Sequence, residues 1–117
     1  MNIPILMTLN PKEDSVLLNE GVLNALDRPR QVQILLNDEE KMLVLRACTV
    51  DERQAVVVPE MRSLQYEISG RNLIRKIKRI GGWTDDRPRV LQGEYLPAHQ
   101  AIRFSIPDAQ PLDIEPV

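Results

Sequence analysis

The residues best suited to binding a ligand are the cations Arg71, Arg75, Lys78 and Arg79, within the stretch "SGRNLIRKIKRIGG" (69–82). They are spaced i, i+4, i+7 and i+8, so a helix would place all four on one face. Such a row of cations can contact the phosphates of double-stranded DNA. The structural alternative is the solvated face of an amphipathic helix, which is the default for surface helices. Both interpretations stay open from the sequence.

A second set of cations flanks two prolines. Arg28 and Arg30 lie on either side of one proline, and Arg87 and Arg89 lie on either side of another. If the two turns occupy equivalent positions in the fold, Arg28 and Arg30 provide a second zone of phosphate contact. The alternative is exposed turn charge, which is the commoner role of such residues.

The sequence lacks the combinations of residues that catalysis or metal binding would need. His99 is the only histidine and Cys48 is the only cysteine. An activated nucleophile needs a base and an orienting group beside it, and a metal site needs several ligands at short spacing. The sequence has no glycine-rich phosphate loop either. It therefore predicts a protein that is not an enzyme, with no cofactor and no evident small-molecule substrate.

The charge of the chain argues against non-specific DNA binding. The 117 residues have a formal net charge of −2 and a pI near 5.4. Residues 1–60 carry 6 Lys/Arg and 10 Asp/Glu, a balance of −4, whereas residues 61–117 carry 9 and 7, a balance of +2. The basic excess is local, so a specific contact is the form of DNA binding that stays open.

Cysteine content and the first residues bear on location. A single cysteine excludes an intrachain disulfide, and a cytosolic location is the simplest interpretation. The apolar start "MNIPILMTL" has no basic flank and is too short to span a membrane. We therefore expect a cytoplasmic protein without a membrane segment.

The first fifty residues predict strands, a helix and a hairpin. Residues 5–10 and 15–19 read as strands around a turn. Asn19 is a good N-cap for a helix from Glu20 to Asp27. Residues 31–37 and 42–48 then form a β-hairpin around the polar turn "DEEK".

The second half repeats this order after a connector at 51–62, which includes a brief strand in "AVVVPEMR" (55–62). Residues 63–69 read as a strand and Ser69 as the next N-cap. The following helix turns Leu73, Ile74, Ile77 and Ile80 toward the core, and Gly81 is the expected C′ residue, free to take a positive φ after the last turn. Residues 89–96 and 101–107 form a second hairpin, and residues 108–117 read as an extended or flexible tail.

The repetition indicates two β-α-β-β units, at 1–50 and 63–107, in an α+β fold with few short helices. Each unit alone would bury too little apolar surface to be stable. The two must therefore share one core, either within the chain or between chains.

The segment "LMTLNPKEDSVLLNEGVLNALDRPRQVQILLNDEEKMLVLRAC" (6–48) resembles the AbrB/MazE/SpoVT-like swapped-hairpin family, and two units in tandem are similar to the MraZ arrangement. The resemblance implies an interdigitated small barrel, usually a homodimer, that often binds DNA as a transcriptional regulator or an antitoxin. The sequence departs from the family where DNA is contacted. The strand at 6–10 has no Arg or Lys, Asp14-Ser15 stands in place of a Gly-Arg pair, and Lys12 is the only cation of the following loop.

Two functions follow as expectations. The first is a small homodimeric regulator that binds double-stranded DNA through Arg71, Arg75, Lys78 and Arg79, with help from Arg28 and Arg30. The alternative is a protein-interaction or assembly module that keeps the fold without binding DNA.

Overall fold

The computed structural model describes residues 3–29, 31–48, 55–57 and 65–112. The predicted strands and both predicted helices are present in this part of the chain, with most ends where they were predicted and the others shifted by one or two residues. In chain order the elements are β1 (Leu6–Asn10), η1 (Pro11–Glu13), β2 (Ser15–Asn19), α1 (Glu20–Ala25), β3 (Gln31–Asn37), β4 (Met42–Ala47), β5 (Ala55–Val57), β6 (Gln65–Ser69), α2 (Arg71–Gly81), β7 (Arg89–Leu96), η2 (Pro97–His99), β8 (Ala101–Ser105), η3 (Ile106–Asp108) and β9 (Gln110–Pro111).

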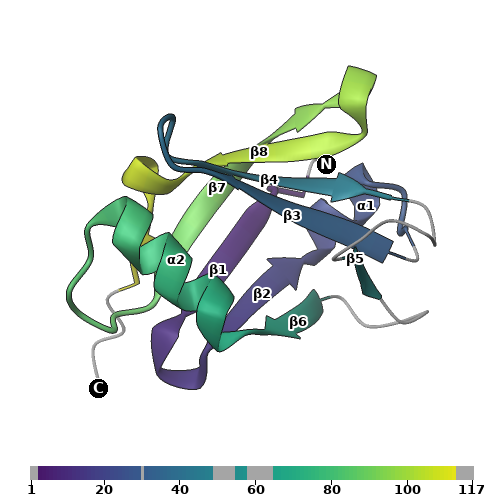
Figure 1. Ribbon diagram of the computed structural model, residues 1–117. Helices are drawn as coiled ribbons and strands as arrows, with labels where there is room; N and C mark the ends of the chain where they lie inside the picture. The colour runs from purple at the N-terminus through teal and green to yellow at the C-terminus, as the bar shows by residue number, and fades with distance from the viewer. Residues whose placement is uncertain (1–2, 30, 49–54, 58–64, 113–117) are drawn as a thin grey trace.

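The strands form one sheet in the order β5-β3-β4-β8-β7-β1-β2-β6, with β9 paired to β7, and each of these pairings is antiparallel. Figure 1 shows the sheet curled into a half-barrel, with α2 and α1 toward opposite sides of the view. The predicted α+β class is confirmed in this form. The sheet is not closed into a barrel within the described residues, because its two end strands, β5 and β6, are not paired with each other.

The two hairpins have the same register. Adding 59 to each residue number turns the β3–β4 pair Leu36–Leu43 into the β7–β8 pair Tyr95–Ile102. The other pairs of β7 with β8 follow from β3 and β4 by the same shift. The match therefore concerns strand register and not only the order of elements.

Two further pairings join equivalent strands of the two halves. β4 pairs with β8 about Val44 and Arg103, which are again 59 apart, and β2 pairs with β6 about Leu17 and Glu67, which are 50 apart. An antiparallel pair centred on equivalent residues is what a two-fold axis between the halves produces. The strands of the two halves consequently alternate in twos across the sheet.

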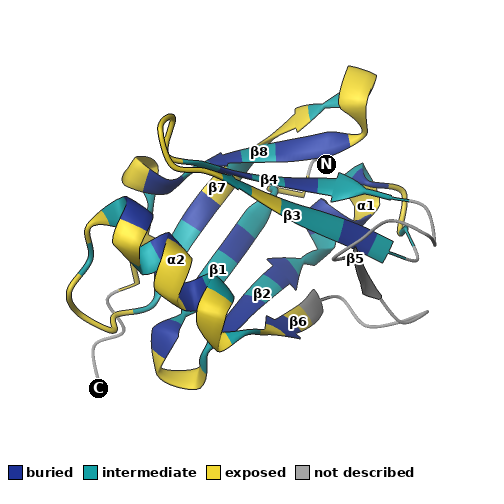
Figure 2. Cartoon of the chain, viewed as in Figure 1, coloured by how far each residue is buried: buried dark blue, intermediate teal, exposed yellow. Residues whose placement is uncertain are grey.

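The core lies on the concave face of the sheet and under α2. Alternate residues of the strands point inward, and Figure 2 shows buried and intermediate positions alternating along β1 and β4. Helix α2 packs against the sheet through Ile74, Ile77 and Ile80, which are buried and lie on one face at positions i, i+3 and i+6. Phe104 is fully buried and is the largest such side chain. Burying each of these side chains contributes about 1.5–3 kcal/mol.

The predicted cap of α1 is confirmed, and the predicted cap of α2 is wrong. Asn19 Oδ1 accepts hydrogen bonds from Val22 N (3.0 Å) and Leu6 N (3.1 Å). Ser69 is instead the last residue of β6, and Gly70 is the N-cap of α2 without a side-chain hydrogen bond. One extra residue separates strand from helix in the second half, because Gly70 N pairs with Asp14 O (2.8 Å) before the helix begins.

Both helix ends differ from the prediction. Helix α1 ends at Ala25 and not at Asp27, since Asp27 already has a positive φ of 57°. Helix α2 includes Gly81, and Gly82 is the left-handed residue that ends it, with φ 69°.

Part of the segment predicted as a tail is paired with the sheet. Gln110 and Pro111 form β9 against β7, and Leu112 N donates to Pro88 O (2.8 Å). Arg30 and the segments 49–54, 58–64 and 113–117, which include parts of the predicted connector, strand and tail, lie outside the described residues.

Candidate functional site

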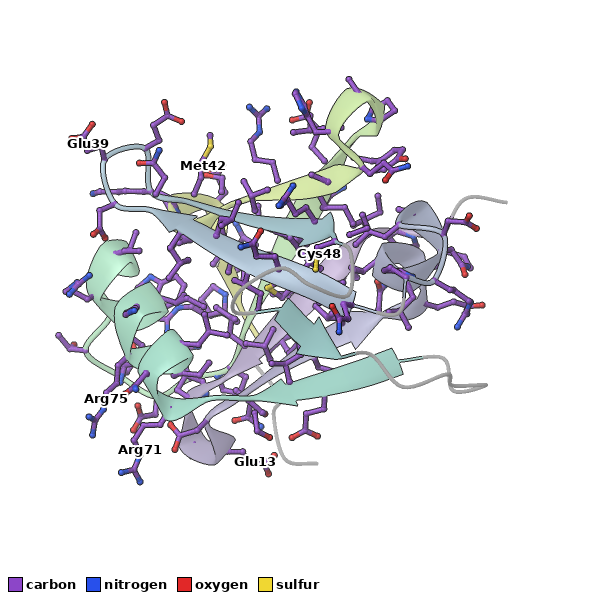
Figure 3. The ribbon with its side chains drawn as sticks, turned by 45° about the vertical axis from the view of Figure 1, so that its right-hand side comes forward. Glu13, Glu39, Met42, Cys48, Arg71 and Arg75 are labelled. Carbon is purple, nitrogen blue, oxygen red and sulfur yellow. The ribbon has the colours of Figure 1, made fainter. Side chains whose placement is uncertain are left out.

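The exposed cations of α2 are Arg71, Arg75, Lys76 and Arg79, which we call the basic face of α2. Figure 3 shows Arg71 and Arg75 pointing outward from the helix. The side chains of Arg71 and Arg79 are 69% and 67% exposed. Three of the four residues predicted from the helical spacing therefore do share an exposed face.

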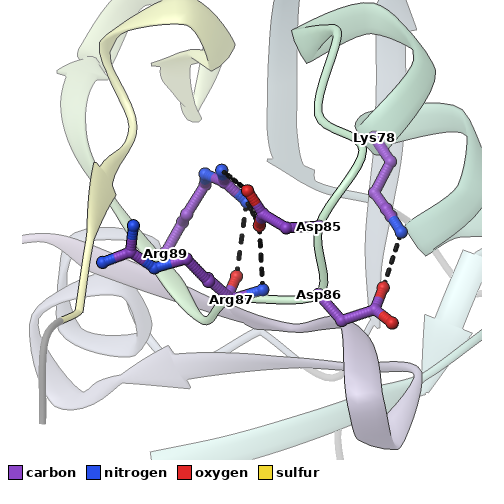
Figure 4. A network of polar contacts seen from close by, with 5 residues as sticks. All are labelled: Lys78, Asp85, Asp86, Arg87 and Arg89. Carbon is purple, nitrogen blue, oxygen red and sulfur yellow. Dashed lines mark hydrogen bonds and ion pairs between the residues drawn. The ribbon is translucent and has the colours of Figure 1, made fainter.

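The fourth predicted residue, Lys78, is turned away from this face. Its Nζ lies 2.6 Å from Asp86 Oδ1 in the loop after α2, and its side chain is only 25% exposed (Figure 4). Lys76, which the helical spacing left out, is exposed in its place. The misassignment arises because the loop at 83–88 packs along one side of the helix, which the spacing of residues does not reveal.

Carboxylates from other elements neutralise part of the basic face. Arg71 Nε lies 3.6 Å from Asp14 Oδ2, and Arg79 Nη2 lies 3.4 Å from Asp38 Oδ2. Exposed pairs of this kind contribute only about 0–1 kcal/mol, so a stronger ligand can displace them. Arg75 and Lys76 make no ion pair within the described residues.

The cations of the two Arg-Pro-Arg turns do not extend the basic face of α2. Arg28 follows α1, toward the opposite side of the molecule from α2 (Figure 1), and its Nε donates to Asn24 Oδ1 (3.1 Å). Arg30 lies outside the described residues. Arg89 is the equivalent of Arg30 in the second half. It is only 8% exposed, so it contributes to the interior and not to a surface.

Arg89 belongs to a structural network (Figure 4). Its Nη1 and Nη2 donate to Asp85 Oδ1 (2.9 Å) and Oδ2 (3.1 Å), and its guanidinium carbon lies 4.3 Å from the centre of the Trp83 ring. The hydrogen bonds from Arg89, with one from Arg87 N, hold the pKa of Asp85 below its ordinary value of 3.8. The bidentate pair of Arg89 with Asp85 and its contact with the Trp83 ring fix the loop between α2 and β7.

A groove of about 490 Å³ runs between α2 and β3, and we call it the α2–β3 groove. Figure 1 shows the two elements facing each other across the open side of the half-barrel. Five of its lining residues are aliphatic and three are charged: Ile34, Leu35, Leu36, Leu73 and Ile80, with Asp38, Lys76 and Arg79. Leu35 is 42% exposed, one of the most exposed large apolar side chains of the described residues. Sequence reasoning missed this site, because its two walls, β3 and α2, are far apart in the chain.

The other chemistry-bearing residues are dispersed. His99 is exposed in η2, and Cys48 follows the end of β4. In the part of the chain that the structure describes, no three His, Cys, Asp or Glu side chains gather where they could hold a metal ion. None of the helices described is long and apolar enough to cross a membrane.

Comparison with models of known protein families, with curated proteins and with solved structures found no match to this chain.

Proposed function

We propose that the protein is a non-catalytic interaction module that binds a segment of a partner protein in the α2–β3 groove. The observation that carries this proposal is the largely half-buried aliphatic lining of the groove, with the exposed Leu35 at its edge and cations from α2 along its rim. Grooves that combine an apolar floor with a few charged groups are the usual form of a peptide-binding site.

Peptide display tests this proposal. Random linear peptides about a dozen residues long are selected on the wild-type protein and then assayed on Leu35→Glu. We expect selected peptides to bind the wild type and to lose at least about tenfold in affinity on the variant, because a carboxylate replaces the exposed aliphatic side chain at the edge of the groove.

The control is Tyr95→Glu, which adds the same charge at an exposed apolar residue of the other hairpin. Leu35→Glu is compatible with the fold, since the residue equivalent to Leu35 in the second hairpin is Glu94. Failure to select any peptide, or equal binding to Leu35→Glu and the wild type, would overturn the proposal.

Double-stranded DNA on the basic face of α2 is the second candidate ligand. Two observations favour DNA. Arg75 is exposed and makes no ion pair in the described residues, and the ion pairs of Arg71 and Arg79 are weak enough for phosphates to replace them. The carboxylates of Asp14 and Asp38 beside them oppose it, because they repel phosphates.

Fluorescence anisotropy with a random duplex of about twenty base pairs tests DNA binding. If DNA is the ligand, binding at micromolar protein weakens steeply with salt and is lost in Arg71→Glu with Arg75→Glu. Neither residue lines the groove, so the same double variant keeps its affinity for groove-selected peptides. Absence of salt-dependent binding would eliminate this candidate.

The finer architecture belongs to the same proposal. We assign the chain two β-α-β-β units in a swapped-hairpin arrangement, supported by the shared hairpin register and the alternation of the two halves across the sheet. The homodimer stays a prediction. One chain already supplies both halves, so a dimer would join two complete half-barrels, and light scattering would give twice 13.4 kDa.

A further inference from the structure

Among the described residues, the edge of β3 that faces the groove is paired only along Gln31–Gln33. β5 pairs with Gln31, Val32 and Gln33, and no described strand pairs with the rest of β3 on that side. An unpaired strand edge is a template for the addition of another strand.

The backbone groups on this edge can be identified from the alternation of the ladder. Gln31 O accepts from Cys48 N (3.1 Å) on the side of β4, so odd-numbered residues of β3 bond to β4. The N–H and C=O groups of Ile34 and Leu36 therefore point away from β4, toward the groove. Neither residue has a further hydrogen bond among the described residues on this edge.

Helix α2 provides the opposite wall. Leu73 and Ile80 lie one above the other along it and present aliphatic surface, and Lys76 lies between them in sequence. Lys76 has no carboxylate partner in the described residues, whereas Arg79 is loosely paired with Asp38 at 3.4 Å. The wall thus combines apolar contacts with one cation that is available to a ligand.

We infer that the partner segment binds as an extended strand added to the free edge of β3, with a carboxylate of the segment paired to Lys76. This inference rests on the proposed function and adds how the partner segment binds and which side chains it carries. The free part of β3 from Ile34 to Asn37 accommodates about four residues of added strand, roughly 13 Å. Alternate side chains of the segment face Leu73 and Ile80 and are apolar, and backbone hydrogen bonds to Ile34 and Leu36 fix its register.

The occupant is a peptide of acidic character and not a nucleic acid, for two reasons. The described residues that line the groove are aliphatic or charged, and none of them offers an aromatic ring on which a base could stack. The unpaired backbone edge is complementary to another backbone, and the available Lys76 is complementary to one carboxylate.

Backbone N-methylation of a groove-selected peptide tests the strand mode. Each N–H is replaced in turn by N–CH₃, which removes a donor without changing the side chains. We expect methylation at two alternate positions to weaken binding by about tenfold or more and the residue between them to tolerate it. Tolerance at every position would overturn strand addition, while the loss of binding in Leu35→Glu would still uphold the proposed function.

Charge exchange tests the role of Lys76. Lys76→Glu should lower the affinity for the peptide by about tenfold, and replacing the acidic residue of the peptide by lysine should restore binding to that variant. Arg75→Glu is the matched control, because Arg75 is an exposed cation one residue away that does not line the groove. Equal effects of the two variants, or no rescue by the lysine peptide, would overturn the pairing with Lys76. Concentration-dependent self-association blocked by Leu35→Glu would identify a second copy as the occupant and overturn the partner-peptide inference.

Discussion

At the scale of single residues, the arginines divide into two roles that the sequence does not distinguish. Arg75 is exposed on the helix, whereas Arg89 is buried against Trp83 and held by Asp85. Both belong to the sets of cations that the sequence suggests as phosphate contacts. What separates them is the loop after α2, which folds back and places two carboxylates beside Lys78 and Arg89.

The network around Asp85 predicts a pH dependence of stability. Its pKa is lowered in the folded protein, chiefly by the hydrogen bonds from Arg89, so its stabilising contribution is present above the ordinary value of 3.8 and is lost as pH falls through the lower folded-state value. Asp85→Asn should therefore have a lower urea midpoint than the wild type at pH 7, and the difference should shrink below pH 3.8. Trp83 fluorescence reports both unfolding transitions.

Asp86→Asn is the control for this experiment. It removes the exposed pair with Lys78, so its midpoint should stay near that of the wild type. A difference between Asp85→Asn and the wild type that is the same at every pH would contradict the assignment of the pKa shift.

At the scale of elements, helix α2 ends on two glycines with different constraints. Gly82 has a φ of 69° and open space around the position of a Cβ, so Gly82→Ala should cost about 1 kcal/mol through backbone strain alone. Gly81 is helical, and a Cβ there would lie 2.5 Å from the ring of Trp83. Gly81→Ala should therefore change the fluorescence of Trp83, whereas Gly82→Ala should lower the urea midpoint and leave the native spectrum unchanged. The opposite pattern would contradict the observed end of the helix.

The elements also show what the sequence could and could not predict. The Asn19 cap, the Ile77 and Ile80 face of α2 and both hairpins follow from local patterns, because their causes lie within a few residues. Gly70 and the groove depend on contacts between distant segments. Gly70 N bonds to Asp14 O, and the groove forms only where β3 extends beyond β5 opposite α2. Local patterns contain no information about such contacts.

At the scale of the whole molecule, the two halves share one sheet. The pairings β1–β7, β2–β6 and β4–β8 each join a strand of one half to a strand of the other. Each half alone would leave two or more strand edges unpaired and its apolar face exposed.

This interleaving predicts that fragments 1–50 and 51–117 do not fold as monomers but reassemble when mixed. The expected result is poor dispersion in the NMR spectrum of each isolated fragment and a native-like spectrum of the equimolar mixture. A monomeric fragment with a well-dispersed spectrum would show that one half carries its own core, contrary to the observed pairing.

The central claim is that β3 offers a free backbone edge to a partner segment, and amide hydrogen exchange tests it most directly. In the free protein the amides of Ile34 and Leu36 should exchange fast relative to Leu43 and Leu45 of β4, which is paired on both sides. Adding a groove-selected peptide should slow the exchange of the Ile34 and Leu36 amides. The exchange rates of Gln92 and Glu94 in the second hairpin should stay unchanged. Slow exchange of Ile34 and Leu36 before the peptide is added, or no change on its addition, would contradict the account.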